Sequence, residues 1–167
     1  MQHRTSVRAI FHCSLERAFK SPMLCDVTKV HSGWLMMPKV THCEGDATWG
    51  RTNGSRRVFI QGNFFYKGGE AALDTVLERT ENRYWKIEIS NLRYFLFGIT
   101  RLQGEWATKE IEKERIEVTY SYTLFSNEWA LYPLHWFIVK VIWRRYMRHV
   151  MENVRVLAYS SATYTHD

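Results

Sequence analysis

The sequence lacks the motifs that would assign a chemistry directly. Its 167 residues contain no Cys-x-x-Cys pair, no Gly-x-Ser-x-Gly nucleophile motif and no Gly-Lys-Ser/Thr phosphate loop. The seven histidines show no His-x-His or His-x-x-x-His spacing. His42, Cys43 and Glu44 are adjacent on an expected strand, where successive side chains point to opposite faces and do not converge on one ion. We therefore expect no metal site and no cofactor.

Cysteine is also scarce. The three cysteines, Cys13, Cys25 and Cys43, are an odd number at wide spacing. A strand-like pattern begins close to Met1, without a secretory signal before it. These features predict reduced thiols and a cytoplasmic protein.

The sequence has no long hydrophobic run. Its most apolar stretch, from Leu134 to Trp143, is about ten residues long, half of the roughly 20 that span a bilayer, and contains His135 and Lys140. We therefore expect no transmembrane segment. Residues 140–155 carry five basic side chains and one acidic side chain, a net charge of +4, so a peripheral contact with a membrane remains an alternative.

Positive charge is present but spread out. The net charge is +6, yet no run of five or more Lys or Arg residues occurs. This pattern does not favour specific nucleic-acid binding.

Aromatic residues, in contrast, are abundant. They make up 15% of the sequence, with 7 Trp, 9 Tyr and 9 Phe, within a hydrophobic fraction of 46%. Only three prolines and no linker or repeat interrupt the chain, and its length suits one domain, residues 1–167. Rings in this number either fill a core or line a cavity.

Hydrophobic periodicity predicts an α+β protein. Residues 5–13 alternate as a strand, Ser14 caps a short helix over 15–20 that Ser21-Pro22 ends, and a second short helix covers about 23–31, with Asp26 near its start. Strands with short polar turns follow, which predicts an antiparallel meander. The expected strands are residues 38–44, 48–60, 70–79, 84–90, 99–110 and 115–125.

The last long segment predicts a helix. From Pro133 onward no glycine or second proline occurs for more than 20 residues, and proline suits a first helical turn. Apolar residues recur at helical spacing and form a wide stripe, which indicates a helix lying across a concave surface. The stripe comprises Leu131, Leu134, Ile138, Ile142, Tyr146, Val150, Val154 and Leu157, with Phe137, Val139, Val141, Trp143 and Met147 beside it.

Short motifs accompany this order of elements: Ser14 to Phe19, Gly45, Trp49-Gly50-Arg51, Gly54, Arg57-Val58, Gly104-Glu105-Trp106 and Ile116 to Tyr122. Order and motifs together resemble the START-like helix-grip fold of the SRPBCC superfamily, which includes polyketide cyclases, lipid-transfer proteins and pollen-allergen-like proteins. The resemblance covers about residues 5–159. It implies a curved antiparallel sheet of about six to seven strands wrapped around the C-terminal helix, with two short helices after the first strand. One departure is segment 62–69, which is longer and more aromatic than the usual hairpin.

The resemblance implies an apolar cavity between the sheet and the helix. Rings from both elements either line this cavity or fill it as a solid core. The candidate ligand-binding residues are Trp85, Trp106, Tyr120, Tyr122, His135, Trp136 and Trp143. No catalytic residue is assigned. Arg51 and Arg57 either point inward, to hold a carboxylate or phenolate, or are solvated, and Asp74 and Glu78 are expected on the exposed face.

Three functions remain open. The first is binding of a small hydrophobic or aromatic molecule, lipid- or polyketide-like. The second, implied by the resemblance, is a polyketide cyclase or aromatase that shapes a reactive chain and moves protons with one or two polar side chains. The third is a protein-interaction module that uses Phe64-Phe65-Tyr66 or the basic helix face. The sequence assigns no oligomeric state.

Overall fold

The computed structural model describes residues 1–64, 67–93, 98–160 and 162–165. A strand and two short helices are followed by six strands and a long C-terminal helical segment. The strands are β1 (Gln2–Phe11), β2 (Val40–Gly45), β3 (Ser55–Ile60), β4 (Gly69–Thr80), β5 (Tyr84–Ser90), β6 (Ile99–Glu112) and β7 (Arg115–Ser126). The helical elements are α1 (Leu15–Leu24), α2 (Val27–Val30), η1 (Trp129–Leu131), α3 (Tyr132–Phe137), η2 (Ile138–Trp143) and α4 (Arg144–Tyr159).

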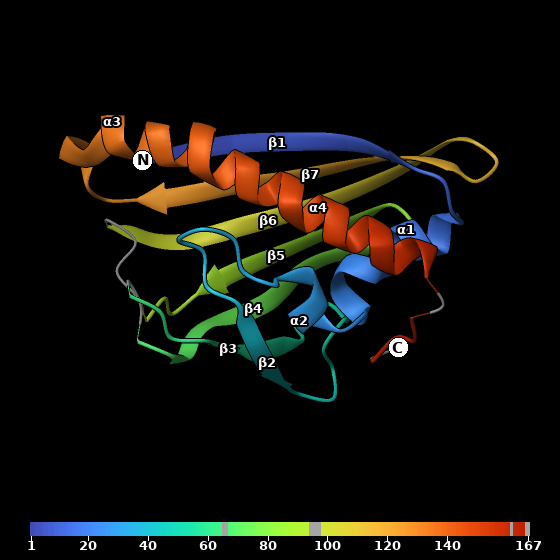
Figure 1. Cartoon of the computed structure of the whole chain (residues 1–167), viewed down its shortest axis with the longest axis horizontal. Coiled ribbons are helices and arrows are strands. Elements are labelled where there is room, and N and C mark those ends of the chain that lie inside the picture. Colours follow the sequence, from blue (N-terminus) through green and yellow to red (C-terminus); the bar gives the residue numbers. More distant parts are fainter. Residues whose placement is uncertain (65–66, 94–97, 161, 166–167) are drawn as a thin grey trace.

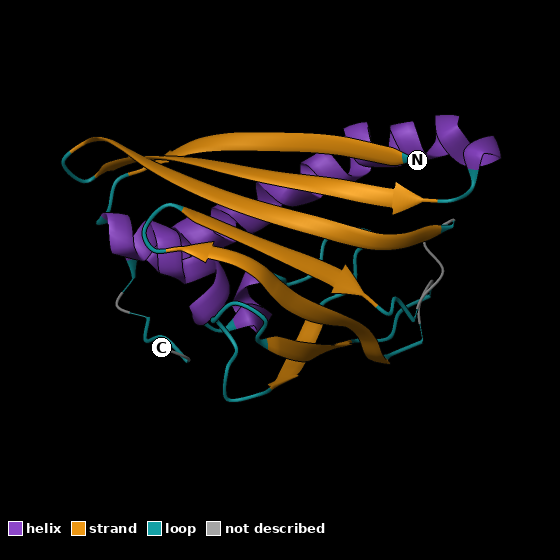
Figure 2. Ribbon diagram, turned by 180° about the vertical axis from the view of Figure 1, so that it is seen from behind, coloured by secondary structure: helices purple, strands orange, loops and turns teal. Residues whose placement is uncertain are grey.

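One antiparallel sheet holds all seven strands in the order β1-β7-β6-β5-β4-β3-β2. The long helical segment crosses one face of this curved sheet diagonally, and α1 and α2 lie beside its C-terminal half (Figure 1). Seen from behind, the strands cover the helices (Figure 2). The predicted helix-grip architecture is therefore confirmed.

Strand β7 shows why the sheet has one apolar face. Its buried apolar residues Ile116, Val118, Tyr120, Tyr122 and Leu124 occur at every second position, as the alternating pattern predicted, although the polar Ser121 and Thr123 between them are buried as well. The apolar residues point toward the helices, because successive side chains of a strand lie on opposite faces. This strand supplies two of the rings of the site described below.

The prediction that Ser21-Pro22 ends α1 was wrong, since the helix continues to Leu24. A proline inside a helix leaves the carbonyl four residues earlier without its N–H donor, here the carbonyl of Ala18. The indole Nε1 of Trp106 donates to that oxygen at 3.0 Å, so a sheet tryptophan replaces the missing bond. Ser14 caps the helix as predicted and accepts from the Arg17 amide at 3.3 Å.

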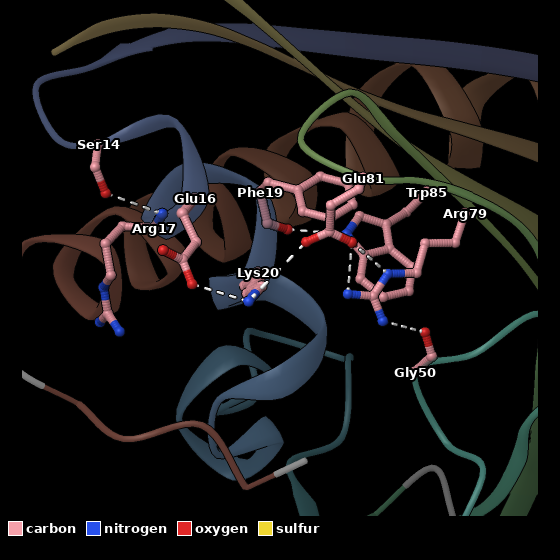
Figure 3. Close-up of polar contacts among 9 residues, drawn as sticks. All are labelled: Ser14, Glu16, Arg17, Phe19, Lys20, Gly50, Arg79, Glu81 and Trp85. Atoms are coloured by element: carbon pink, nitrogen blue, oxygen red, sulfur yellow. Dashed lines mark hydrogen bonds and ion pairs between the residues drawn. The ribbon is translucent and has the colours of Figure 1, made fainter. Parts of the chain in front are cut away.

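Further polar contacts fasten α1 between the sheet and the end of the long helix. The indole of Trp85 donates to the Phe19 carbonyl at 2.9 Å (Figure 3). That of Trp49 donates to the Met23 carbonyl at 3.1 Å. The Arg17 guanidinium donates to four carbonyl oxygens in and just after the last turn of α4, those of Leu157, Ala158, Ser160 and Ala162. Helix α1 is thereby fixed at one end of the cavity.

Three other elements differ from the predicted ranges, the first being β1, which covers Gln2–Phe11 instead of residues 5–13. Helix α2 covers only Val27–Val30, with Asp26 as its N-cap, and β3 begins at Ser55 because the residues before it form turns. Asn53 in these turns has a φ of 67°, a left-handed conformation that asparagine tolerates. The strands from β4 onward agree with the predicted ranges to within two residues.

The long helical segment is continuous, but it contains a π-helical stretch, η2 (Ile138–Trp143). A π turn has more residues than an α turn and rotates the buried face of the residues before it. Val139 and Trp143 are fully buried, whereas Ile138 and Ile142, which the regular stripe placed inside, are only half-buried. The π stretch therefore helps to direct Trp143 into the interior.

Among the described residues, no helix is both long and apolar enough to cross a membrane. No group of three or more His, Cys, Asp or Glu side chains in the described ranges is arranged to hold a metal ion. Phe64 is 97% exposed, and Phe65 and Tyr66 lie outside the described residues.

Candidate functional site

A partly enclosed cavity of about 120 Å³ lies between the sheet and the helices. Strands β2 to β7 form its floor, and α1, α2, η2 and α4 form its other walls. Most of the lining side chains are apolar, and a small set of polar groups, from His31, Arg56, Asp74, Tyr120, Tyr122 and Tyr146, also faces it. An apolar cavity with a few convergent polar groups is the usual form of a small-molecule site.

A connected row of rings forms one wall of the cavity. The ring of Trp106 lies 5.3 Å from that of Tyr120, which lies 5.3 Å from Tyr122. Tyr122 in turn lies 5.4 Å from Trp143, and Trp143 lies 5.8 Å from Tyr146. These are the tilted and edge-to-face contacts that aromatic quadrupoles favour. The row runs from β6 across β7 to the long helix and fixes the orientation of each ring.

The two tyrosines of β7 lie against each other. Burial raises the pKa of Tyr122 to about 12 and that of Tyr120 well above its ordinary value, and the interaction between the two hydroxyls adds to the rise at Tyr120. Both phenols are therefore neutral at physiological pH. Gly104 makes room for this pair, because a Cβ there would lie 3.0 Å from the Tyr122 ring.

Trp143 brings a polar group without a partner. Its side chain lines the cavity and is 4% exposed, and its indole Nε1 is buried with no hydrogen-bond partner among the described residues. Trp49, Trp85 and Trp106 each donate to a carbonyl of α1 instead. A buried N–H that pairs with nothing costs about 1–3 kcal/mol, so it gains most from an acceptor brought by a ligand.

A buried ion pair lies on the sheet side. Arg56 and Asp74 are directly opposite on β3 and β4, with Nε and Oδ2 3.1 Å apart and both side chains less than 10% exposed. The guanidinium also stacks over the Trp49 ring at 3.8 Å. Burial raises the pKa of the Asp74 carboxyl, and the nearby Arg56 charge opposes this rise.

A histidine–tyrosine pair lines the cavity on the side of the helices. The Nδ1 atom of His31 lies 2.7 Å from the Tyr146 hydroxyl, in a hydrogen bond whose donor depends on the histidine tautomer. Burial, together with the positive charge of Arg56, lowers the pKa of His31 from 6.5 to about 4. His31 is therefore neutral at pH 7 and is a weak base.

This neutral histidine makes stability depend on pH. The pKa of His31 is lower in the folded chain than in the unfolded one. Folding stability is therefore highest above pH 6.5 and falls as the pH drops toward 4, because the unfolded chain binds a proton there that the folded chain does not. We expect a loss on the order of 2 kcal/mol, allowing for the partly exposed ring. Denaturant unfolding from pH 7 to pH 4 should show this slope, and His31→Gln should flatten it. Equal slopes in the two proteins would contradict the assignment to His31.

Five of the seven ligand-binding candidates from the sequence line the cavity: Trp85, Trp106, Tyr120, Tyr122 and Trp143. His135 and Trp136 do not line it. His135 is buried beyond the cavity, beside the His3 ring at 5.9 Å, and Trp136 is 49% exposed on α3. The rotation of the buried face at η2 explains this difference, because regular α-helical spacing does not include it.

Apart from the two tyrosines of β7, the polar groups of the site were not predicted from the sequence. Arg56, not Arg51 or Arg57, is the inward arginine, and Arg57 forms an exposed ion pair with Glu44. Asp74 is buried, although the pattern placed it on the exposed face, whereas Glu78 is exposed as expected. The pairing of β3 with β4 would have indicated this ion pair, because it places Arg56 directly opposite Asp74.

No family model and no curated protein sequence matches the chain. Its fold, however, matches solved structures over most of their length, and the chain shares their helix-grip fold. The crystal structure of Ara h 8.0201 aligns with a TM-score of 0.69 at 12% identity, covering 95% of this chain and 98% of that one.

Two further structures show the same likeness. A Staphylococcus aureus protein of unknown function aligns with a TM-score of 0.69 at 14% identity, covering 95% of this chain and 94% of that chain. A Thalictrum norcoclaurine synthase point mutant, in complex with a transition-state analogue, aligns with a TM-score of 0.68 at 11% identity over the same fractions. At these identities the likeness establishes the fold.

Proposed function

We propose that the protein binds a compact aromatic molecule of one or two rings, with at least one hydrogen-bond acceptor, in the cavity between the sheet and the helix. The observation that carries the proposal is the buried indole N–H of Trp143, which has no partner among the described residues and belongs to a wall of rings. An acceptor on the ligand would satisfy this donor, while the rings would contact the ligand's faces and edges.

The cavity volume sets the size of the ligand. A cavity of roughly 150 Å³ accepts a benzene-sized molecule, whereas drug-sized ligands occupy roughly 300–1,000 Å³. The volume of about 120 Å³ in this protein therefore favours a small flat molecule over a long lipid chain. One ring fills most of this space, and because the cavity is only partly enclosed, a second fused ring would extend toward its opening. The buried guanidinium of Arg56 adds a positive charge that suits a phenolate or a polarised carbonyl.

The cavity favours binding over catalysis. A cyclase or aromatase needs a group that takes a proton near the working pH. The pKa of His31 is about 4, which makes it a poor base at pH 7, and Asp74 is held by Arg56 in an ion pair. The two tyrosines are neutral and lie against each other. We therefore place ligand binding first, and the cyclase reaction remains the alternative.

A matched pair of probes tests the role of Trp143. Coumarin and naphthalene have two fused rings each, but only coumarin carries a carbonyl acceptor. We expect Trp143→Phe to weaken coumarin binding roughly three- to tenfold, the value of one neutral hydrogen bond, because phenylalanine keeps a ring and removes the donor. Naphthalene affinity should stay nearly the same. Isothermal titration calorimetry measures both affinities.

The alternatives give different results. If neither probe binds the wild-type protein, and neither raises its melting temperature, the cavity is a packed core and the proposal fails. If Trp143→Phe weakens both probes equally, the indole acts through its shape and not through its N–H group. Turnover of an unsaturated polyketide-like chain that is lost in His31→Gln would favour the cyclase alternative.

A further inference from the structure

An exposed aromatic surface lies at the start of the long helical segment, outside the cavity. It comprises Trp129, Tyr132, Trp136 and Phe137, which are 82%, 51%, 49% and 49% exposed, and we call it the α3 surface. Helix α3 lies at the end of the molecule that holds the N-terminus and extends past the end of β7 (Figure 1). Large rings grouped on the outside of a protein mark a contact site.

The α3 surface is supported from below. His135 is 1% exposed on the opposite side of the helix, next to His3, and the His3 ring lies 4.8 Å from that of Tyr132. Lys140 in the next turn donates to the Arg4 carbonyl of β1 at 2.9 Å. The helix is thus anchored on its inner side, while its outer rings stay exposed.

Basic side chains continue this surface along the helix. Arg144, Arg145 and Arg148 are all exposed and follow the rings of the α3 surface along the helix. No acidic residue occurs from Trp129 to Met151. The outer face therefore combines rings at one end with positive charge at the other, and no acidic residue of this segment offsets that charge.

We propose that this face docks on a bilayer that contains anionic lipids. Tryptophan and tyrosine favour the boundary between lipid headgroups and acyl chains, and basic side chains are attracted to the negative charge of such a surface. A second copy of this chain suits the face less well, because a twofold contact would bring the same arginines together without a carboxylate from this segment. The proposal is independent of the ligand in the cavity.

Vesicle co-sedimentation tests the proposal. We expect the wild-type protein to bind vesicles of phosphatidylcholine mixed with phosphatidylserine, to bind pure phosphatidylcholine vesicles far less, and to be released by salt. The double variant Arg144→Glu/Arg145→Glu should lower the affinity at least about 25-fold, about fivefold for each charge removed. Trp129→Ser/Trp136→Ser should also lower it, since these substitutions remove exposed rings.

The matched control is Lys109→Glu/Lys113→Glu, which changes the net charge equally. These exposed lysines lie on and just after β6, toward the turn to β7, which is at the opposite end of the molecule (Figure 1). This control should bind anionic vesicles nearly as well as the wild type. Absence of wild-type binding, or an equal loss in the control, overturns the proposal. A dimer that Trp129→Ser/Trp136→Ser dissociates, without vesicle binding, would identify a self-interface and overturn it as well.

Discussion

The substitution Arg56→Met is expected to lower the free energy of unfolding by about 3–5 kcal/mol, because it leaves the buried Asp74 carboxylate without its counter-charge. Methionine keeps much of the side-chain volume, so the loss is mainly electrostatic. Asp74 then gains a proton in the folded state, and the variant should lose stability as the pH rises above about 4. Denaturant unfolding at several pH values measures both effects.

Two controls separate the buried ion pair from general effects. Arg57→Met makes the same substitution at the next residue, where the ion pair with Glu44 is exposed, and should cost less than about 1 kcal/mol. The double variant Arg56→Met/Asp74→Leu removes both charges and should recover most of the loss. A double variant as unstable as Arg56→Met alone would show that the cation–π contact with Trp49, not the ion pair, is the main contribution.

Much of the fold follows from the sequence, because most of the sheet obeys a period of two. In strands β5 and β7 apolar and polar residues alternate over most of the strand, and the short turns between successive strands leave little choice of topology. The long helix was predictable for a similar reason, since nothing in its sequence breaks it after Pro133.

Tertiary contacts explain the parts that local patterns missed. Pro22 normally ends a helix, but Trp106 donates to the carbonyl that this proline leaves free, and this hydrogen bond is made by a residue 88 positions from Ala18. The π stretch η2 has no comparable local signal, and it moves Trp143 into the cavity wall while Trp136 stays outside. A regular helical stripe cannot anticipate such a rotation.

The candidate site also has a part that the sequence predicts and a part that it does not. Its rings were predictable because large aromatic residues on the apolar faces of a sheet and a helix must meet between them. Its polar pairs were not, because His31 and Tyr146 are 115 residues apart, and Arg56 and Asp74 become neighbours only through the register of two strands. The pKa shifts of these groups arise from burial, which depends on the completed fold.

Filling the cavity should abolish ligand binding without unfolding the protein. Ala72 lies on β4, is 4% exposed and lines the cavity. Ala72→Leu places an isobutyl group where the ligand's ring would lie, in a space of only about 120 Å³. We expect coumarin affinity to fall by more than about 100-fold, since overlapping atoms exclude the ring rather than weaken one contact. Titration calorimetry measures the affinity, and thermal melting checks that the variant remains folded.

Ala107→Leu is the matched control, because it adds the same atoms to β6 on the face of the sheet opposite Trp106 and away from the helices. It should leave coumarin affinity unchanged. The unliganded Ala72→Leu protein should melt at the wild-type temperature or above, because the added side chain buries apolar surface in a cavity that already exists. If coumarin still binds Ala72→Leu with wild-type affinity, the ligand occupies another part of the protein. If Ala72→Leu melts several degrees lower, the space beneath the helix is already filled, and the cavity is too small for the proposed ligand.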